Sequence, residues 1–123
     1  MTNFGDLLAR SDFVSLNCDL NPSSYHLINA DALACMKPDV ILINTSRGPV
    51  IDERVLIDSL QRKEIGGAAL DVFEVELLPE DGPLSHFDNV ILAPHNANSS
   101  PMAWERVHWN TIRNLLEDLE LAT

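Results

Sequence analysis

The chain has 123 residues, of which 46% are hydrophobic and 22% charged, so we expect one folded domain spanning residues 1–123. Nineteen acidic residues against eight basic ones give a net charge of -11, which argues against nucleic acid and anionic membrane surfaces as partners. We interpret the acidity as a contribution to solubility. Cys18 and Cys35 have no metal-binding spacing, and neither a signal peptide nor an apolar run of about 18 residues is evident. These features predict a reduced, cytoplasmic setting.

Turn and cap residues divide the chain into short helices and strands. A helical turn is predicted at Asp6–Arg10. Four apolar runs are predicted strands: Asp12–Asn17, Val40–Asn44, Ala68–Phe73 and Val90–Ala93. Three further helices are predicted: Ala30–Met36 after the N-cap Asn29, one from the cap Asp52 to about Lys63, and one from Pro101 to about Glu120.

Strands and helices alternate along the chain, which predicts an α/β fold with a parallel sheet of about four strands and flanking helices. Val40–Asn44 contains no charge and is followed directly by turn residues, so we expect this strand to be buried on both faces. The connection from the third strand to the fourth, residues 74–89, is long enough to cross over but lacks a clear helical stripe. The first strand has the weakest pattern, because Ser15 and Asn17 interrupt it.

Chemically versatile residues follow each strand. The carboxyl ends of parallel strands share one edge of the sheet, which is where ligands bind. The residues in question are Cys18 and Asp19, then Thr45, Ser46 and Arg47, then Asp71 and Glu76, and finally His95, Asn96 and Asn98. Together they offer a guanidinium for a carboxylate, a histidine for a proton and an acid to orient the histidine. This set suits acid–base chemistry on an anion.

Each of these residues also has a structural interpretation. A single arginine after a strand is often solvated or paired with an acid, and Glu76 lies in an acidic loop. A structural role is favoured for three other histidines: His26, His86 and His108. Asp71 is harder to explain in this way, because it lies within the apolar run AALDVF, where a buried carboxylate needs polar partners. The arginine, acid and histidine at three successive strand ends favour a functional site.

Three segments, NTSRGPVIDERVL, GGAALDVFEVE and NVILAPH, resemble consecutive signatures of the D-isomer-specific 2-hydroxyacid dehydrogenases. That family includes phosphoglycerate, glycerate/hydroxypyruvate and D-lactate dehydrogenases. The resemblance extends from about Leu7 to about Asp118 and implies the second half of a Rossmann-type NAD-binding domain. It also implies hydride transfer between NAD or NADP and a small 2-oxo or 2-hydroxy acid, without specifying which acid.

The resemblance assigns a role to each residue at the strand ends. Arg47 takes the place of the arginine that binds the substrate carboxylate and carbonyl. His95 takes the place of the general acid/base, and Glu76 that of the acid paired with it. Asp71 matches the residue that contacts the nicotinamide end of the cofactor. The positions that line the family's NAD pocket are Cys18, Thr45 and Ser46. A protonated imidazole beside a guanidinium would stabilise the charge that develops on the ketone oxygen.

The sequence departs from the family pattern in three ways. Leu77 follows Glu76, where the family commonly has proline, and Asn96 and Asn98 follow His95, where small or apolar residues are usual. No G-x-G-x-x-G segment occurs among the five glycines, so we expect the pyrophosphate-binding half and the substrate domain to lie outside this chain. NAD or NADP is therefore expected to bind weakly, and the isolated chain to have little dehydrogenase activity.

Two functional hypotheses remain at this point. The first is part of a D-2-hydroxyacid dehydrogenase, and the alternative is a non-enzymatic association or regulatory module derived from such an enzyme. In either case we expect a homo-oligomer or a complex with a complementary chain. The predicted contact surfaces are the strand edge Asp12–Asn17 and the apolar face of the last helix, which includes Trp104 and Trp109.

Overall fold

The computed structural model describes residues 3–76, 78–79, 81–97 and 99–121, the side chains of the last two excepted. One parallel sheet contains four strands in the order β1-β2-β3-β4. The strands are β1 Phe13–Leu16, β2 Ile41–Asn44, β3 Gly67–Leu70 and β4 Val90–Leu92. The predicted strands and their parallel arrangement are confirmed. β3 ends earlier than predicted, since its last residue pairs with the last residue of β2 and the chain leaves the sheet at Asp71.

The helices follow the cap residues of the sequence. They are α1 Phe4–Arg10, α2 Ala30–Ala34, α3 Glu53–Gln61 and α4 Pro101–Leu121. The side chain of Asn29 accepts a hydrogen bond from the Ala32 amide, and Asp52 accepts one from the Val55 amide, which confirms both predicted N-caps. Between β3 and β4 the described residues form only a 3-10 turn, Pro83–His86, as the absence of a helical stripe indicated.

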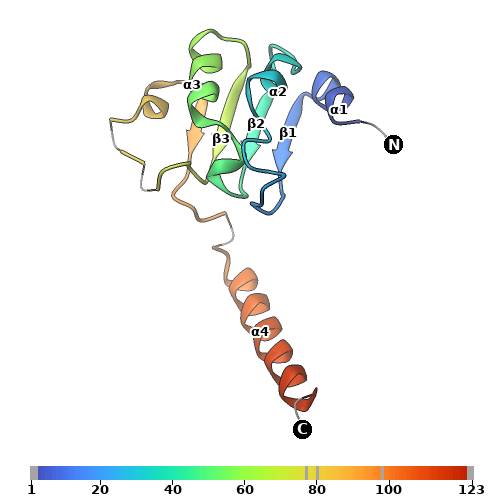
Figure 1. Ribbon diagram of the computed structural model, residues 1–123. Helices are drawn as coiled ribbons and strands as arrows, with labels where there is room; N and C mark the ends of the chain where they lie inside the picture. Colours follow the sequence, from blue (N-terminus) through green and yellow to red (C-terminus); the bar gives the residue numbers. More distant parts are fainter. Residues whose placement is uncertain (1–2, 77, 80, 98, 122–123) are drawn as a thin grey trace.

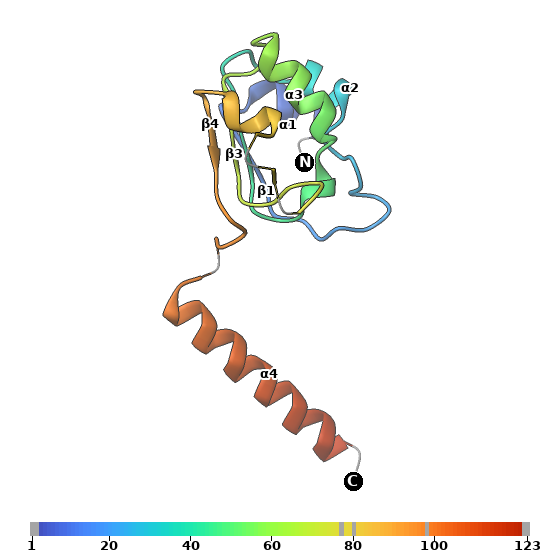
Figure 2. The same ribbon diagram turned by 90° about the vertical axis from the view of Figure 1, so that its left-hand side faces the viewer.

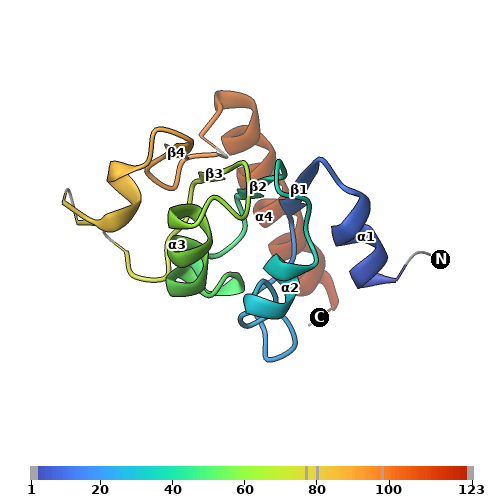
Figure 3. The ribbon, with the colours of Figure 1, turned by 90° about the horizontal axis from the view of Figure 1, so that it is seen from above.

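Helices α1, α2 and α3 all lie against the same face of the sheet (Figure 2), and the view from above shows the same arrangement (Figure 3). The hydrophobic core fills the space between this face and the helices. Val14 and Leu16 of β1 point into it, together with Leu42 of β2 and Leu56 and Leu60 of α3. Their burial on alternate strand positions follows from the two-residue period of a strand.

The opposite face of the sheet has no helix over it among the described residues. Phe13 and Ile91 on this face are 68% and 71% exposed, and Ile41 and Ile43 of β2 are half-buried. The expectation that β2 is buried on both faces is therefore wrong for its outer face. The reason is topological: the strands follow one another in a single direction across the sheet, so the connecting helices fall on one side.

α4 projects away from the sheet at its carboxyl edge, where the loops that follow the strands lie (Figure 1). None of the described side chains of α4 belongs to the buried core. Apart from the half-buried Ala103, residues 101–119 are all exposed. No helix in the described parts of the chain is both long and apolar enough to cross a membrane.

Candidate functional site

The loop after β2 presents Arg47 at the carboxyl edge of the sheet, and a buried amide holds this loop. Asn44, which ends β2, is 1% exposed. Its Nδ2 donates to the Arg47 carbonyl oxygen at 3.0 Å, while its Oδ1 accepts from the backbone nitrogen and hydroxyl of Ser46 at 3.0 and 2.8 Å. These bonds fix the loop from beneath. Sequence analysis missed this role, although a polar residue closing an apolar run was a usable signal.

Gly48 brings the same loop against the segment that follows β3. A Cβ atom at this position would lie 1.8 Å from the carbonyl oxygen of Phe73 and 2.5 Å from the backbone nitrogen of Glu74. Only glycine permits such a close approach of two backbones. The loop that presents Arg47 is therefore packed directly against the segment that leads to Glu76.

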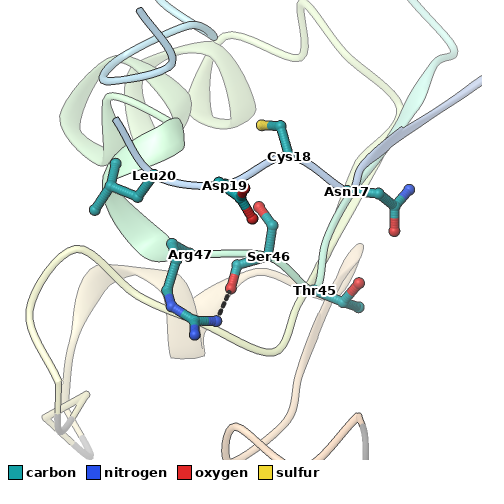
Figure 4. A pocket seen from close by; sticks show the side chains of 7 residues that line it. All are labelled: Asn17, Cys18, Asp19, Leu20, Thr45, Ser46 and Arg47. Atoms are coloured by element: carbon teal, nitrogen blue, oxygen red, sulfur yellow. Dashed lines mark hydrogen bonds between the residues drawn. The ribbon is translucent and has the colours of Figure 1, made fainter. Parts of the chain in front are cut away.

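The residues after β1 and β2 surround an open pocket of about 480 Å³ (Figure 4). Its lining consists of Asn17, Cys18, Asp19, Leu20, Thr45, Ser46 and Arg47. Arg47 Nη1 donates to the Ser46 carbonyl oxygen at 2.7 Å, and the guanidinium forms no ion pair with a carboxylate of the described residues. The pocket thus joins the predicted anion-binding residue to three of the four predicted cofactor contacts, Cys18, Thr45 and Ser46.

Asp71, the fourth predicted cofactor contact, is 5% exposed and binds the loop that follows β4. Its Oδ1 accepts from the backbone nitrogen of Asn96 at 2.8 Å, and its Oδ2 accepts from that of Ala97 at 2.9 Å. These charge-assisted bonds explain how a carboxylate is tolerated within an apolar run. Asp71 is not among the residues that line the Arg47 pocket, and its clearest contact is with the loop that carries His95.

Glu76 and His95 form an acid–histidine pair, with His95 Nδ1 lying 3.4 Å from Glu76 Oε1. The same oxygen of Glu76 accepts the backbone N–H of Phe73 at 3.2 Å. The two side chains are 41% and 49% exposed, so solvent and small molecules reach them. They border a pocket of about 370 Å³ whose other lining residues are Phe73, Leu78, Leu92, Ala93 and Pro94. The proximity predicted for this pair is confirmed.

Glu74 ties the start of the Glu76 segment to α3. Its backbone nitrogen donates to Glu53 Oε2 at 3.0 Å, and the Glu53 backbone nitrogen donates back to Glu74 Oε2 at 3.1 Å. The remaining oxygen, Oε1, lies 2.9 Å from His26 Nε2. His26 therefore has structural partners, in agreement with the role favoured for it, and the whole segment between β3 and Glu76 is anchored.

The site thus has two parts on one edge of the sheet: the Arg47 pocket beside β1 and β2, and the Glu76–His95 pair beside β3 and β4. The two parts line different pockets. Leu77 and Asn98, which sequence analysis singled out, lie outside the described residues. The described residues contain no group of three or more histidine, cysteine, aspartate or glutamate side chains suited to a metal ion. A guanidinium and an acid–histidine pair suit an anionic substrate and a proton transfer.

A parallel α/β sheet with its polar residues gathered along the carboxyl edge is typical of the class of domains that bind nucleotides and other small ligands at that edge. The family model described as the NAD binding domain of D-isomer specific 2-hydroxyacid dehydrogenases matches residues 1–97. The chain belongs to this family, as the three sequence segments indicated.

Similar proteins support the same placement. A glyoxylate reductase from Thermofilum pendens is 47% identical over 119 residues, which is 97% of this chain and 35% of that protein. The structure of an acyclic imino acid reductase (Bsp5) in complex with NADPH and D-Arg matches 98% of this chain and 38% of its own, with a TM-score of 0.90 and 33% identity. A glyoxylate reductase from Paecilomyes thermophila matches 97% of this chain and 36% of its own, with a TM-score of 0.89 and 34% identity. The chain spans about a third of the length of the curated relatives it matches.

Proposed function

We propose that this chain carries part of the catalytic centre of an NAD- or NADP-dependent D-2-hydroxyacid dehydrogenase. The observation that supports this most directly is the 3.4 Å approach of His95 Nδ1 to Glu76 Oε1, on the same sheet edge as Arg47. Arg47 binds the carboxylate of a small 2-oxo acid through its two parallel N–H groups. His95 protonates the carbonyl oxygen as it becomes an alcohol, and Glu76 orients the imidazole.

The cofactor, when bound, supplies the hydride for this reduction. The hydroxyl, amide and thiol groups of the Arg47 pocket fit the polar atoms of the nicotinamide riboside end, so Cys18, Thr45 and Ser46 are proposed cofactor contacts. Asp71 would contact the same end through the lone pairs that its two backbone bonds leave free. Because these 123 residues contain no G-x-G-x-x-G turn for the pyrophosphate, we propose that the chain binds NAD or NADP weakly.

Residues 1–123 are proposed to act as one domain of a cytoplasmic assembly, together with a second copy or with a chain that supplies the rest of the enzyme. The proposed substrate class is a small 2-oxo acid, which agrees with the names of the glyoxylate reductases among the similar proteins. The competing hypothesis, a non-enzymatic association module, is favoured by one feature, the uncovered apolar face of α4.

The proposed function predicts little or no turnover by the purified chain. Hydride transfer needs the nicotinamide and the 2-oxo acid held in reacting geometry, and a displacement of about 1 Å costs on the order of a hundredfold in rate. The measurement is NADH oxidation with glyoxylate, hydroxypyruvate and pyruvate as acceptors. A polypeptide with the glycine-rich half should restore NADH binding, followed by fluorescence, and turnover should appear only when the substrate-binding part is also present.

His95→Ala is the decisive variant in the restored system, and it should abolish turnover while leaving NADH binding in place. His86→Ala, on the 3-10 turn before β4, is the matched control and should leave turnover unchanged. Restored turnover that survives His95→Ala would contradict the proposed role of the acid–histidine pair. Rapid turnover by the purified chain alone would contradict the proposed need for the other parts.

A further inference from the structure

His26 lies where the connections that follow β1 and β2 meet. Its backbone nitrogen donates to the carbonyl oxygen of Pro49 at 2.8 Å, two residues after Arg47. The contact continues as a short parallel bridge between Ile28 and Ile51. The connection after β1 is thereby attached to the loop that presents Arg47, and the attachment begins at His26.

The side chain of His26 contacts a third segment, the one that leads from β3 to Glu76. Its Nε2 lies 2.9 Å from Glu74 Oε1, and the side chain is 27% exposed. An ionised carboxylate only accepts hydrogen bonds, so Nε2 is the ring nitrogen that carries a proton toward Glu74. The other nitrogen, Nδ1, lies 3.7 Å from Asp52 Oδ2, beyond a direct hydrogen bond. Tyr25 stacks on the ring at a centroid distance of 4.0 Å, which favours one orientation of the imidazole.

Glu74 receives the His26 contact together with one from α3. Its Oε2 accepts the backbone N–H of Glu53 at 3.1 Å, while Oε1 faces His26. One carboxylate therefore binds the connections after β1 and β2 to the segment after β3. Glu76 lies only two residues further on, so the position of Glu74 determines where the Glu76 carboxylate meets His95.

The backbone of His26 indicates a functional reason for these contacts. Its φ is 49°, in the left-handed region that residues with a Cβ atom disfavour. Among the residues that the structure describes, the other non-glycine residues with a positive φ are Lys63 and His95 itself. Such strain persists only where surrounding contacts over-determine it, and it gathers at functional sites. Here the contacts with Pro49 and Glu74, one to the backbone and one to the ring, hold His26 in place.

We propose that His26 and Glu74 are positioning residues, which set the distance between the two parts of the site. These parts, the Arg47 pocket and the Glu76–His95 pair, belong to different loops and line different pockets. Without the contact the Glu76 segment is freed, so the acid–histidine pair loosens and its distance from Arg47 varies. The kinetic consequence rests on the proposed dehydrogenase function, whereas the geometry is tested without turnover.

Two substitutions of His26 separate the ring contact from the backbone strain. Asparagine adopts the left-handed region readily but is too short to reach Glu74, whereas the amide nitrogen of glutamine reaches the position of Nε2 but keeps the strain. His26→Gln should therefore preserve the site, and His26→Asn should disturb it. A role confined to backbone stability predicts the reverse order. Lys63→Asn, at a positive φ just after α3, is the matched control for introducing asparagine.

The first measurement is NMR of the histidine ring nitrogens in the purified full chain. The Nδ1 signal of His95 reports the contact with Glu76, and Glu76→Ala defines the unpaired value. In His26→Asn this signal should move most of the way to the unpaired value. His26→Gln and Lys63→Asn should match the unaltered chain. Circular dichroism checks that each variant keeps its helix content.

The second measurement is turnover of the restored system with glyoxylate as acceptor. His26→Asn should lower kcat about tenfold and leave KM nearly unchanged, because Asn44 still holds the Arg47 loop. An unmoved His95 signal or an unchanged kcat in His26→Asn would overturn the proposal, as would a His26→Gln variant that behaves like His26→Asn. Restored turnover that survives His95→Ala contradicts the proposed function instead, and the His95 signal alone then decides the positioning role.

Discussion

At the scale of single residues, two buried polar side chains hold the loops that carry Arg47 and His95. Asn44 fixes the loop that presents Arg47, and Asp71 fixes the loop that carries His95. Each is at most 5% exposed, and each forms two hydrogen bonds with backbone groups of the loop that it holds. Such groups destabilise a fold when their partners are lost, because the desolvated atom is left unsatisfied. The precision of the site therefore depends on residues that need not touch a ligand.

The Asp71→Asn variant tests how much such buried hydrogen bonds contribute to the stability of the fold. An asparagine offers one acceptor oxygen and places an NH2 group against a backbone N–H, so the variant should lose about 1.5–3 kcal/mol of unfolding free energy. Urea denaturation at neutral pH measures the change. Asp12→Asn is the control, since Asp12 is 71% exposed in its ion pair with Lys37 and should shift the midpoint very little. Equal midpoints for Asp71→Asn and the unaltered chain would show that the two backbone bonds contribute no net stability.

Close backbone contacts join separate elements into one support for the site. The loop after β2 touches the segment after β3 at Gly48, and Glu74 of that segment is bonded to Glu53 at the start of α3. The Gly48 contact and the two hydrogen bonds between Glu53 and Glu74 each join residues that lie more than twenty positions apart in the sequence. A substitution where these segments meet should therefore alter both the Arg47 pocket and the Glu76–His95 pair.

Gly48→Ala is the corresponding variant at the element scale. Its Cβ would meet the Phe73 carbonyl oxygen at 1.8 Å, so the backbones must separate, and we expect a loss of about 1–3 kcal/mol of stability or more. Gly5→Ala in α1 is a control that should have the opposite effect on stability. The nearest atom to a Cβ at this position is a side-chain atom at 3.6 Å, and alanine is favoured over glycine in a helix by up to about 1 kcal/mol. In thermal unfolding, Gly48→Ala should lower the midpoint temperature and Gly5→Ala should raise it. A neutral result for Gly48→Ala would mean that the two loops separate without cost.

The whole molecule consists of a packed body and a projecting helix. The buried core runs from Leu8 to Leu84 and includes no residue of α4. The stability of the body is therefore expected not to depend on α4. This division is why a chain can keep the fold of its family domain and still expose a large apolar surface.

A shortened chain that ends after residue 98 tests whether the body is equally stable without α4. At a concentration where the full chain is monomeric, both chains should unfold at the same urea concentration, because α4 contributes nothing to the core. A clearly lower unfolding midpoint for the shortened chain would show that α4 packs on the body in solution.

The sequence alone determined the strands, the helix caps, the parallel order of elements, the family and the set of residues at the sheet's carboxyl edge. All of these depend on local signals: the period of apolar residues, the chemistry of caps and turns, and short motifs. Asp71 shows the limit of such signals. Its place in an apolar run indicated polar partners, but the partners themselves lie 25 and 26 residues away.

Only the tertiary structure decided how these residues are grouped. It placed Arg47 with Cys18, Thr45 and Ser46 in one pocket and Glu76 with His95 beside another. It also left the outer face of β2 half-buried, where the apolar pattern indicated burial on both faces, and it left α4 uncovered, as expected for the contact surface predicted there. An apolar sequence pattern indicates that a surface will be buried against another surface. Whether the covering surface belongs to the same chain depends on the side of the sheet on which the connecting segments lie.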